Sequence, residues 1–79
     1  MTYAIHSITT KFIGPTGVKG SRIKAKTSTG SKTMPYNHAW NADENHETAA
    51  ELLAAELGMN YATITSAVIE TGTHIHILQ

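Results

Sequence analysis

The sequence contains no cysteine, only two prolines and few aromatic residues. Without cysteine the chain has neither a disulfide nor a thiolate metal site, so it must fold by packing alone or with the help of self-association. No apolar run approaches the roughly 18–20 residues of a membrane span, and the first residues lack a basic segment followed by an apolar signal core. These absences argue against disulfide scaffolds and membrane proteins, and we expect a cytoplasmic protein.

The length of the chain predicts a single domain over residues 1–79. Domains mostly run from about 50 to 250 residues, which leaves no room for a second one. A chain of this size buries only roughly 60–65% of the surface that its unfolded form exposes, so its margin of stability is thin. Large multi-step enzymes are excluded by the same argument.

The charged residues are few and are divided along the chain. They make up 15% of the sequence, with six basic and six acidic residues and a net charge of zero. Every basic residue lies between positions 11 and 32, and every acidic residue lies between positions 43 and 70. Such asymmetry is typical of an anion-binding surface, and nucleic acid is the commonest large anion. The alternatives are two solvated faces, or head-to-tail contacts between neighbouring molecules.

The first residues have the composition of a β-strand. Residues 3–13 are rich in β-branched and aromatic types and show no helical periodicity. Their apolar side chains alternate imperfectly, which favours a bulge or bend near Ser7–Thr10. The following segment, residues 14–21, contains three glycines and a proline and is predicted to be a loop.

Two further strands are predicted after this loop. Residues 22–27 alternate cleanly, which places Ile23 and Ala25 on the core side and the basic residues on the other. A turn then leads to a strand over residues 32–38. Because Pro35 cannot donate a ladder hydrogen bond, we expect this strand at an edge of the sheet.

A helix is predicted over residues 43–57. Asn41 followed by Glu44 has the form of a capping box, and Gly58 stands where a helix usually ends. Apolar residues recur at helical spacing and should pack on the sheet: Ala49, Ala50, Leu52, Leu53 and Leu57.

The last part of the chain is predicted less completely. Residues 60–72 have strong β-propensity but poor alternation, and fit either a strand or an ordered connection. Thr73–Leu78 is predicted to form the last strand. The resulting order is β-β-β-α-β. It predicts an α+β fold with a small antiparallel or mixed sheet of three to four strands and one helix packed on one face.

The basic strand is the candidate site. Arg22, Lys24 and Lys26 occupy alternate positions, so they stand about 6.5–7 Å apart on one pleated face, close to the phosphate spacing of one nucleic-acid strand. The alternative is a charged edge strand that prevents sheet-to-sheet aggregation. The predicted nucleic-acid-binding residues are Lys11, Lys19, Arg22, Lys24 and Lys26.

The histidines are weaker candidates. If Ile75 and Ile77 point to the core, His74 and His76 lie on the open face beside the cations, where His6 could join them. Zinc requires three or four ligands, and no cysteine or carboxylate is adjacent in the sequence, so we expect no metal and no cofactor.

Catalysis finds little support in the sequence. There is no cysteine nucleophile and no G-x-S-x-G motif, and most carboxylates belong to the solvated side of the helix. We therefore expect a protein that is not an enzyme. His46 is expected to hydrogen-bond the loop before the helix, and Trp40 to anchor the helix on the sheet.

Three segments, Ile8–Thr16, Gly20–Ala25 and Glu44–His46, carry a resemblance. Together with Ala49-Ala50 and Leu57-Gly58 they resemble a group of small uncharacterised proteins of phages, plasmids and other bacterial mobile elements. The resemblance implies an accessory protein that contacts nucleic acid or blocks a host defence system. It also implies contacts by the loop before the basic strand, with Asn45 and His46 reaching that loop from the helix start. The implied loop residues are Gly14, Pro15, Thr16, Gly20 and Ser21.

The sequence as a whole predicts a small binding module whose first partner is nucleic acid. One alternative is an inhibitor of a host defence complex that acts by protein–protein binding. Another is a structural accessory protein that forms oligomers, with a homodimer as the simplest case. No membrane partner is expected.

Overall fold

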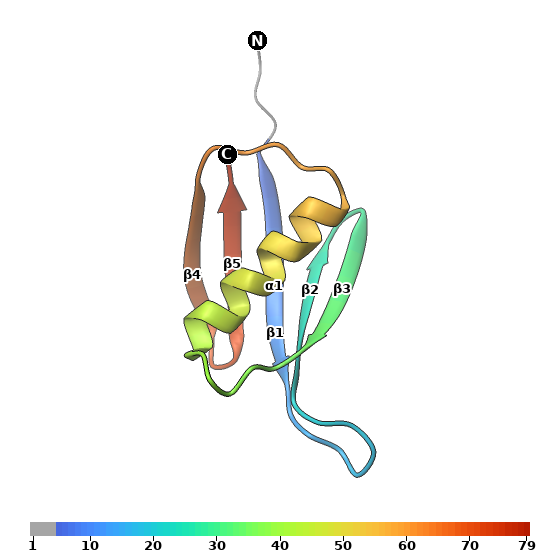
Figure 1. The fold of residues 1–79 in the computed structure, drawn as a ribbon. Helices are drawn as coiled ribbons and strands as arrows, with labels where there is room; N and C mark the ends of the chain where they lie inside the picture. Colours follow the sequence, from blue (N-terminus) through green and yellow to red (C-terminus); the bar gives the residue numbers. More distant parts are fainter. Residues whose placement is uncertain (1–4) are drawn as a thin grey trace.

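The computed structural model describes residues 5–79 as five strands and one helix (Figure 1). All neighbouring strands pair antiparallel, in the order β3-β2-β1-β5-β4. The elements are β1 (His6–Ile13), β2 (Arg22–Thr27), β3 (Gly30–Pro35), α1 (Ala42–Glu56), β4 (Ile64–Glu70) and β5 (Thr73–Leu78). The predicted α+β class and the order of elements are confirmed, and Pro35 does end an edge strand.

The predicted count of three to four strands is too low. The additional strand is β4, which lies within the segment that fitted either a strand or a connection. Only Ile64 of this strand is partly buried, and its other residues are exposed. A strand at the edge of a sheet that buries so little does not need the apolar alternation by which strands are recognised.

β1 runs through the middle of the sheet without the bulge expected near Ser7–Thr10. It pairs with β2 on one side and with β5 on the other, and neither register shifts. Ile8 and Thr10 face the helix whereas Ile13 faces away, so the imperfect alternation reflects a strand with apolar residues on both faces. The one register shift among the described strands lies in β4, between Val68 and Glu70. Tyr3 lies outside the described residues.

The helix begins and ends where its caps predict. The Glu44 N–H donates to Asn41 Oδ1 (2.8 Å), the Asn41 N–H donates to Glu44 Oε1 (3.3 Å), and Gly58 follows with a φ of +69°. The buried side differs from the predicted stripe, because Leu52 is 43% exposed and Leu57 is 38% exposed. The buried helical residues are Asn45, His46, Ala49, Ala50, Leu53 and Ala54.

α1 crosses one face of the sheet diagonally, from the side of β4 and β5 to the end of β3 (Figure 1). The core lies between helix and sheet and is built from Ile8, Ile23, Ala25, Ala49, Ala50, Leu53, Ala54 and Leu78. Trp40, expected to anchor the helix, is 38% exposed and is not part of this core. No helix of residues 5–79 is both long enough and apolar enough to cross a membrane.

Candidate functional site: the open face of the sheet

The face of the sheet opposite α1 carries a cluster of cations. Arg22, Lys24 and Lys26 project from β2 on the side opposite the buried Ile23 and Ala25, as the alternation predicts. In β1, Lys11 is the direct partner of Lys24, and directly paired residues share a face. We call these four residues the basic strip: Lys11, Arg22, Lys24 and Lys26.

The basic strip has no carboxylate partner among the described residues. Two ion pairs occur in residues 5–79: Lys32 with Glu56 (3.0 Å), and His74 with Asp43 (3.9 Å), the latter an ion pair only when His74 is protonated. Neither lies on the open face. Like charges directly opposite each other in a sheet destabilise it, so the Lys11–Lys24 pair lowers the stability of the free protein. An anion bound at this place would relieve that repulsion.

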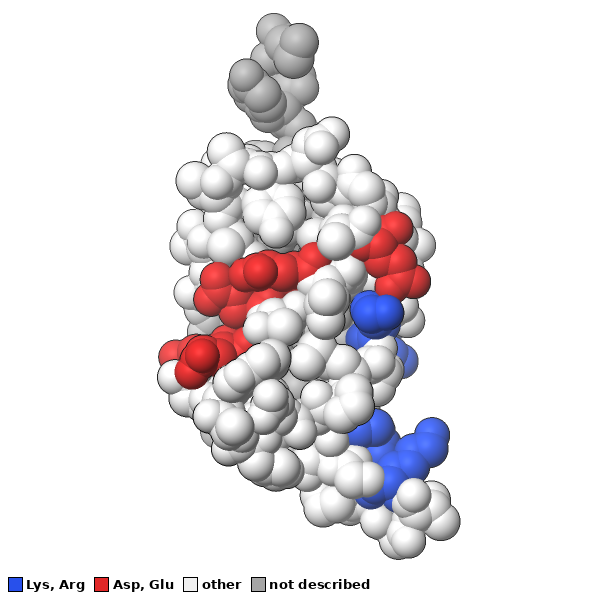
Figure 2. Space-filling model, in the orientation of Figure 1, with Lys and Arg blue, Asp and Glu red and all other residues white. Residues whose placement is uncertain are grey.

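Five of the six acidic residues lie on α1, which forms the other layer of the molecule, and the sixth, Glu70, ends β4. Figure 2 views the helix side and shows the acidic side chains in a band over α1, with basic side chains at one margin and near the loop over residues 14–21. The division of charge along the sequence has therefore become a division between layers. The helix layer is mainly acidic, whereas the open face of the sheet carries the basic strip and one carboxylate, Glu70, which pairs with Thr73 opposite Lys11.

The loop over residues 14–21 extends beyond the end of the sheet (Figure 1). Thr16 closes a tight turn in it, because its backbone N–H donates to the Lys19 carbonyl (2.7 Å) and its hydroxyl accepts from the Lys19 N–H (3.0 Å). Arg22 donates to the Gly20 carbonyl (3.3 Å), which ties the basic strip to the loop. The other loop residues named from the resemblance are exposed or half-buried: Gly14, Pro15 and Ser21.

Asn45 and His46 do not bond this loop. The Asn37 N–H donates to Asn45 Oδ1 (2.8 Å), and the Asn45 amide donates to the carbonyls of Asn37 (2.9 Å) and Asn41 (3.0 Å). Asn45 therefore fastens the connection between β3 and α1. His46 is buried beneath the helix and bonds Thr10 of β1 (2.7 Å). The expectation that either residue supports the 14–21 loop is wrong, because Asn45 bonds the β3–α1 connection and His46 bonds β1.

His74 and His76 do not lie on the open face, which corrects the arrangement in which Ile75 and Ile77 point to the core. Both histidines are buried on the helix side, and the two isoleucines are half-exposed on the open face. The burial is possible because polar partners from other elements meet the imidazoles there. Sequence alternation alone favours the apolar residue inside and cannot reveal those partners.

Four side chains form a continuous hydrogen-bonded chain under the helix. Thr10 Oγ1 lies 2.7 Å from His46 Nδ1 and 2.8 Å from His76 Nε2. The other ring nitrogen of His76, Nδ1, lies 2.6 Å from Ser66 Oγ. His74 stacks on His46 with ring centroids 3.7 Å apart and planes 5° from parallel. We call these five residues the histidine cluster.

Burial keeps two of these imidazoles neutral. It lowers the pKa of His46 and of His76 to about 4, and repulsion from His74 adds to the effect. Among residues 5–79, no group of three or more histidine, cysteine or carboxylate side chains is placed to hold a metal ion. The sequence did carry one signal of this cluster: His46 stands three and four positions before Ala49 and Ala50, on the buried stripe of the helix.

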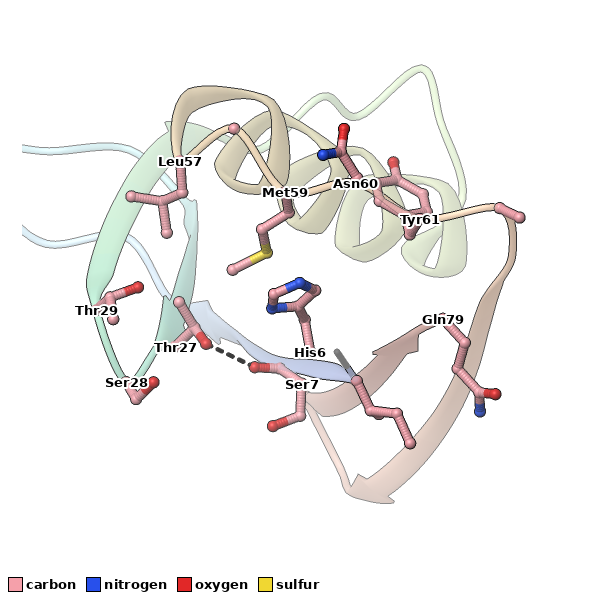
Figure 3. Close-up of a pocket in the computed structure, with 13 residues that line it drawn as sticks. His6, Ser7, Thr27, Ser28, Thr29, Leu57, Met59, Asn60, Tyr61 and Gln79 are labelled. Atoms are coloured by element: carbon pink, nitrogen blue, oxygen red, sulfur yellow. Dashed lines mark hydrogen bonds between the residues drawn. The ribbon is translucent and has the colours of Figure 1, made fainter. Parts of the chain in front are cut away.

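A hollow of about 1130 Å³ lies at the end of the sheet where β1 begins and α1 ends (Figure 3). His6, Met59 and Tyr61 lie around it, and Thr27 donates to the Ser7 carbonyl at its wall (2.7 Å). The residues that line it in the described part of the chain include no lysine, arginine, aspartate or glutamate, and none of them belongs to the basic strip.

Comparison of the chain with protein-family models, with curated proteins and with solved structures finds no match.

Proposed function

We propose that the protein is a small cytoplasmic accessory protein of a phage or other mobile element, and that it binds nucleic acid through the basic strip. One observation carries the proposal: four cations stand together on an uncovered sheet face, two of them directly opposite each other, with no carboxylate partner among the described residues. Phosphates spaced along a nucleic-acid strand provide the missing negative charges.

The composition of the open face favours contacts to phosphates over stacking of bases. None of its described strand residues is aromatic. Phe12 lies on the helix side and meets Tyr36 edge to face at 5.2 Å, while Tyr36 packs against the core. Base stacking, the usual means of holding single strands without reading their sequence, has no platform here. Backbone contacts carry no sequence information, so binding should depend little on sequence.

Fluorescence anisotropy with single- and double-stranded DNA and RNA at two salt concentrations tests the proposal. If each of the four cations neutralises one phosphate of a duplex, log affinity falls against log salt with a slope of about −3.6. That slope corresponds to a roughly 10²-fold loss of affinity between about 50 and 200 mM salt. An absence of binding at about 50 mM salt and tens of micromolar protein would overturn the proposal.

Two matched variants separate the basic strip from net charge. Lys24→Gln removes an exposed cation of the strip, and we expect it to weaken binding and to reduce the salt slope by about 0.9. Lys32→Gln removes the same charge from the helix side, where Lys32 pairs with Glu56, and should leave the slope unchanged. Equal losses in both variants would mean that the strip has no special role.

The half-exposed isoleucines favour a second candidate. Ile13, Ile75 and Ile77 lie on the same face as the basic strip. A protein with an acidic surface would cover both groups, as an inhibitor of a host defence complex would need to do. An interface that buries these apolar groups should depend far less on salt than phosphate contacts do. A flat salt profile with a protein partner would therefore favour the inhibitor.

A further inference from the structure

The two edges of the sheet differ in how they resist pairing with another strand. An edge strand exposes unpaired N–H and C=O groups, and proteins protect such edges with charges, prolines, β-bulges or covering elements. β3 carries both Lys32 and Pro35. In β4, by contrast, residues 64–68 contain neither a charge nor a proline, and the register shift and Glu70 lie beyond them.

β4 is also the least covered strand. Every residue from Thr65 to Glu70 is exposed, with Val68 at 61% and Ile69 at 58%. α1 packs over β1, β2 and β3 and reaches β5 only at its first turns. Two large aliphatic side chains thus stand in solvent at this edge.

We infer that β4 is a dimer interface, where two copies of the chain pair edge to edge with their β4 strands antiparallel around a two-fold axis. The regular part of β4 runs from Ile64 to Val68, since the register shifts beyond it. An axis at its middle residue, Ser66, places Ile64 of each copy opposite Val68 of the other. Aliphatic pairs of this kind stabilise antiparallel strands.

The charges around the interface favour a second copy as the occupant. No like charges face each other across this register, because residues 64–68 are uncharged. Asp43 and Glu47 line a small cleft with Val68, and Glu70 follows Val68 by two positions in β4. In the dimer they face the uncharged segment before Ile64 of the other copy. The pairing is therefore self-complementary, as a two-fold interface requires.

The dimer is expected to be reversible. Edge-to-edge pairing buries less than the roughly 800 Å² per partner of a standard interface, so we expect dissociation in the micromolar range. The inference does not depend on the proposed function, because the dimer forms without nucleic acid. Its consequence for that function is a single ten-stranded sheet that carries two basic strips.

Sedimentation equilibrium of the full chain over a concentration series tests the inference. We expect a species of twice the chain mass that dissociates on dilution. Val68→Lys, which adds a charge to the edge beside Asp43 and Glu47, should weaken the dimer at least tenfold. A monomer at every concentration up to about 1 mM, or a dimer unchanged by a folded Val68→Lys protein, would overturn the inference.

A pair of single-cysteine variants tests the register even if Val68→Lys fails to fold. The native chain has no cysteine, so any disulfide must join two copies. Directly opposed residues of an antiparallel pair lie about 4.5–5.5 Å apart at Cα, within the range that a disulfide spans. A mixture of the Thr65→Cys and Ala67→Cys proteins, whose residues oppose each other across an axis at Ser66, should cross-link under mild oxidation, and Ser31→Cys on β3 should not. Cross-linking through Ser31→Cys alone would place the interface at the other edge.

Discussion

At the scale of single residues, Thr10 determines how the histidine cluster is connected. Its hydroxyl has one proton and lies within hydrogen-bond distance of both His46 and His76. It can donate to one imidazole only, and must accept from the other. His76 is bonded at both nitrogens, so its tautomer fixes the direction of the whole chain from Ser66 to His46. The cluster therefore has two self-consistent arrangements of protons, which run in opposite directions.

Thr10→Val should be strongly destabilising although it hardly changes the volume of the side chain. It leaves His46 Nδ1 and His76 Nε2 without a partner, and each buried polar atom left unsatisfied costs ~1–3 kcal/mol. We expect the free energy of unfolding to fall by about 2–6 kcal/mol in urea denaturation. The matched control is Thr33→Val, on the exposed side of β3, which should change it by less than ~0.5 kcal/mol. Similar values for the two variants would contradict the connectivity of the cluster.

The sequence predicted the basic residues better than the histidines, for a physical reason. Arg22, Lys24 and Lys26 were placed correctly because their alternation is local to one strand. His76 is satisfied by Thr10, which is 66 positions away, and by Ser66 of a strand that the pattern did not resolve. The residues close to His76 in the sequence give no indication of these partners.

At the scale of the elements, the ends of α1 are specified by local chemistry. The capping box at Asn41 and the glycine at position 58 both act within a few residues, so the sequence predicts them well. The rotation of the helix is set by the sheet instead. The described helix buries Asn45 and His46 and leaves Leu52 partly exposed. Asn45 finds its partners in the β3–α1 connection, and His46 finds Thr10 in the sheet beneath it.

Gly58→Ala tests the end of the helix. The φ of +69° at this position is the left-handed region, which costs a residue with a Cβ about 1–2 kcal/mol, while no atom within 4 Å would clash. We expect the variant to lose that amount of unfolding free energy. Gly17→Ala is the matched control, since Gly17 has open space around it and no positive φ. A loss of stability at Gly17 as large as that at Gly58 would show that the backbone at 58 is not the cause.

At the scale of the whole molecule, the fold converts a division of charge in sequence into a division in space. The basic residues lie mainly on β1, β2 and their loop, and most carboxylates lie on α1, so the two layers carry opposite charge. Lys11 belongs to the basic strip only because the register of β1 with β2 places it opposite Lys24. Such a pairing between strands is what a single sequence does not reveal.

The stability of the whole fold should depend on pH through His46 and His76. Unfolded, these imidazoles take up protons below about pH 6.5, whereas in the fold they resist protonation until about pH 4. Between these values the unfolded chain binds more protons, so the free energy of unfolding falls as the pH is lowered. The loss should be on the order of 3 kcal/mol for each histidine by pH 4.

Urea denaturation between pH 7.5 and 4.5 measures this dependence. Thr10, Ser66, His74 and Asp43 surround the two imidazoles, and only His74 and Asp43 carry ionisable groups. His76→Gln removes one of the two titrating groups and should flatten the profile. A wild-type profile that stays flat from pH 7 to 5 would show that the imidazoles are not protected as described.

The place of β1 in the sheet has a consequence for the order in which the protein assembles. β1 and β2 are joined by a short loop, so the basic strip needs only the closure of a hairpin. The histidine cluster and the β1–β5 ladder bring together residues as far apart as Thr10 and His76, which requires a long loop to close against its entropy. Closing the hairpin is therefore expected to be faster than the meeting of β1 with β5. The basic strip depends on contacts between segments close in the chain, whereas the core depends on contacts between distant ones.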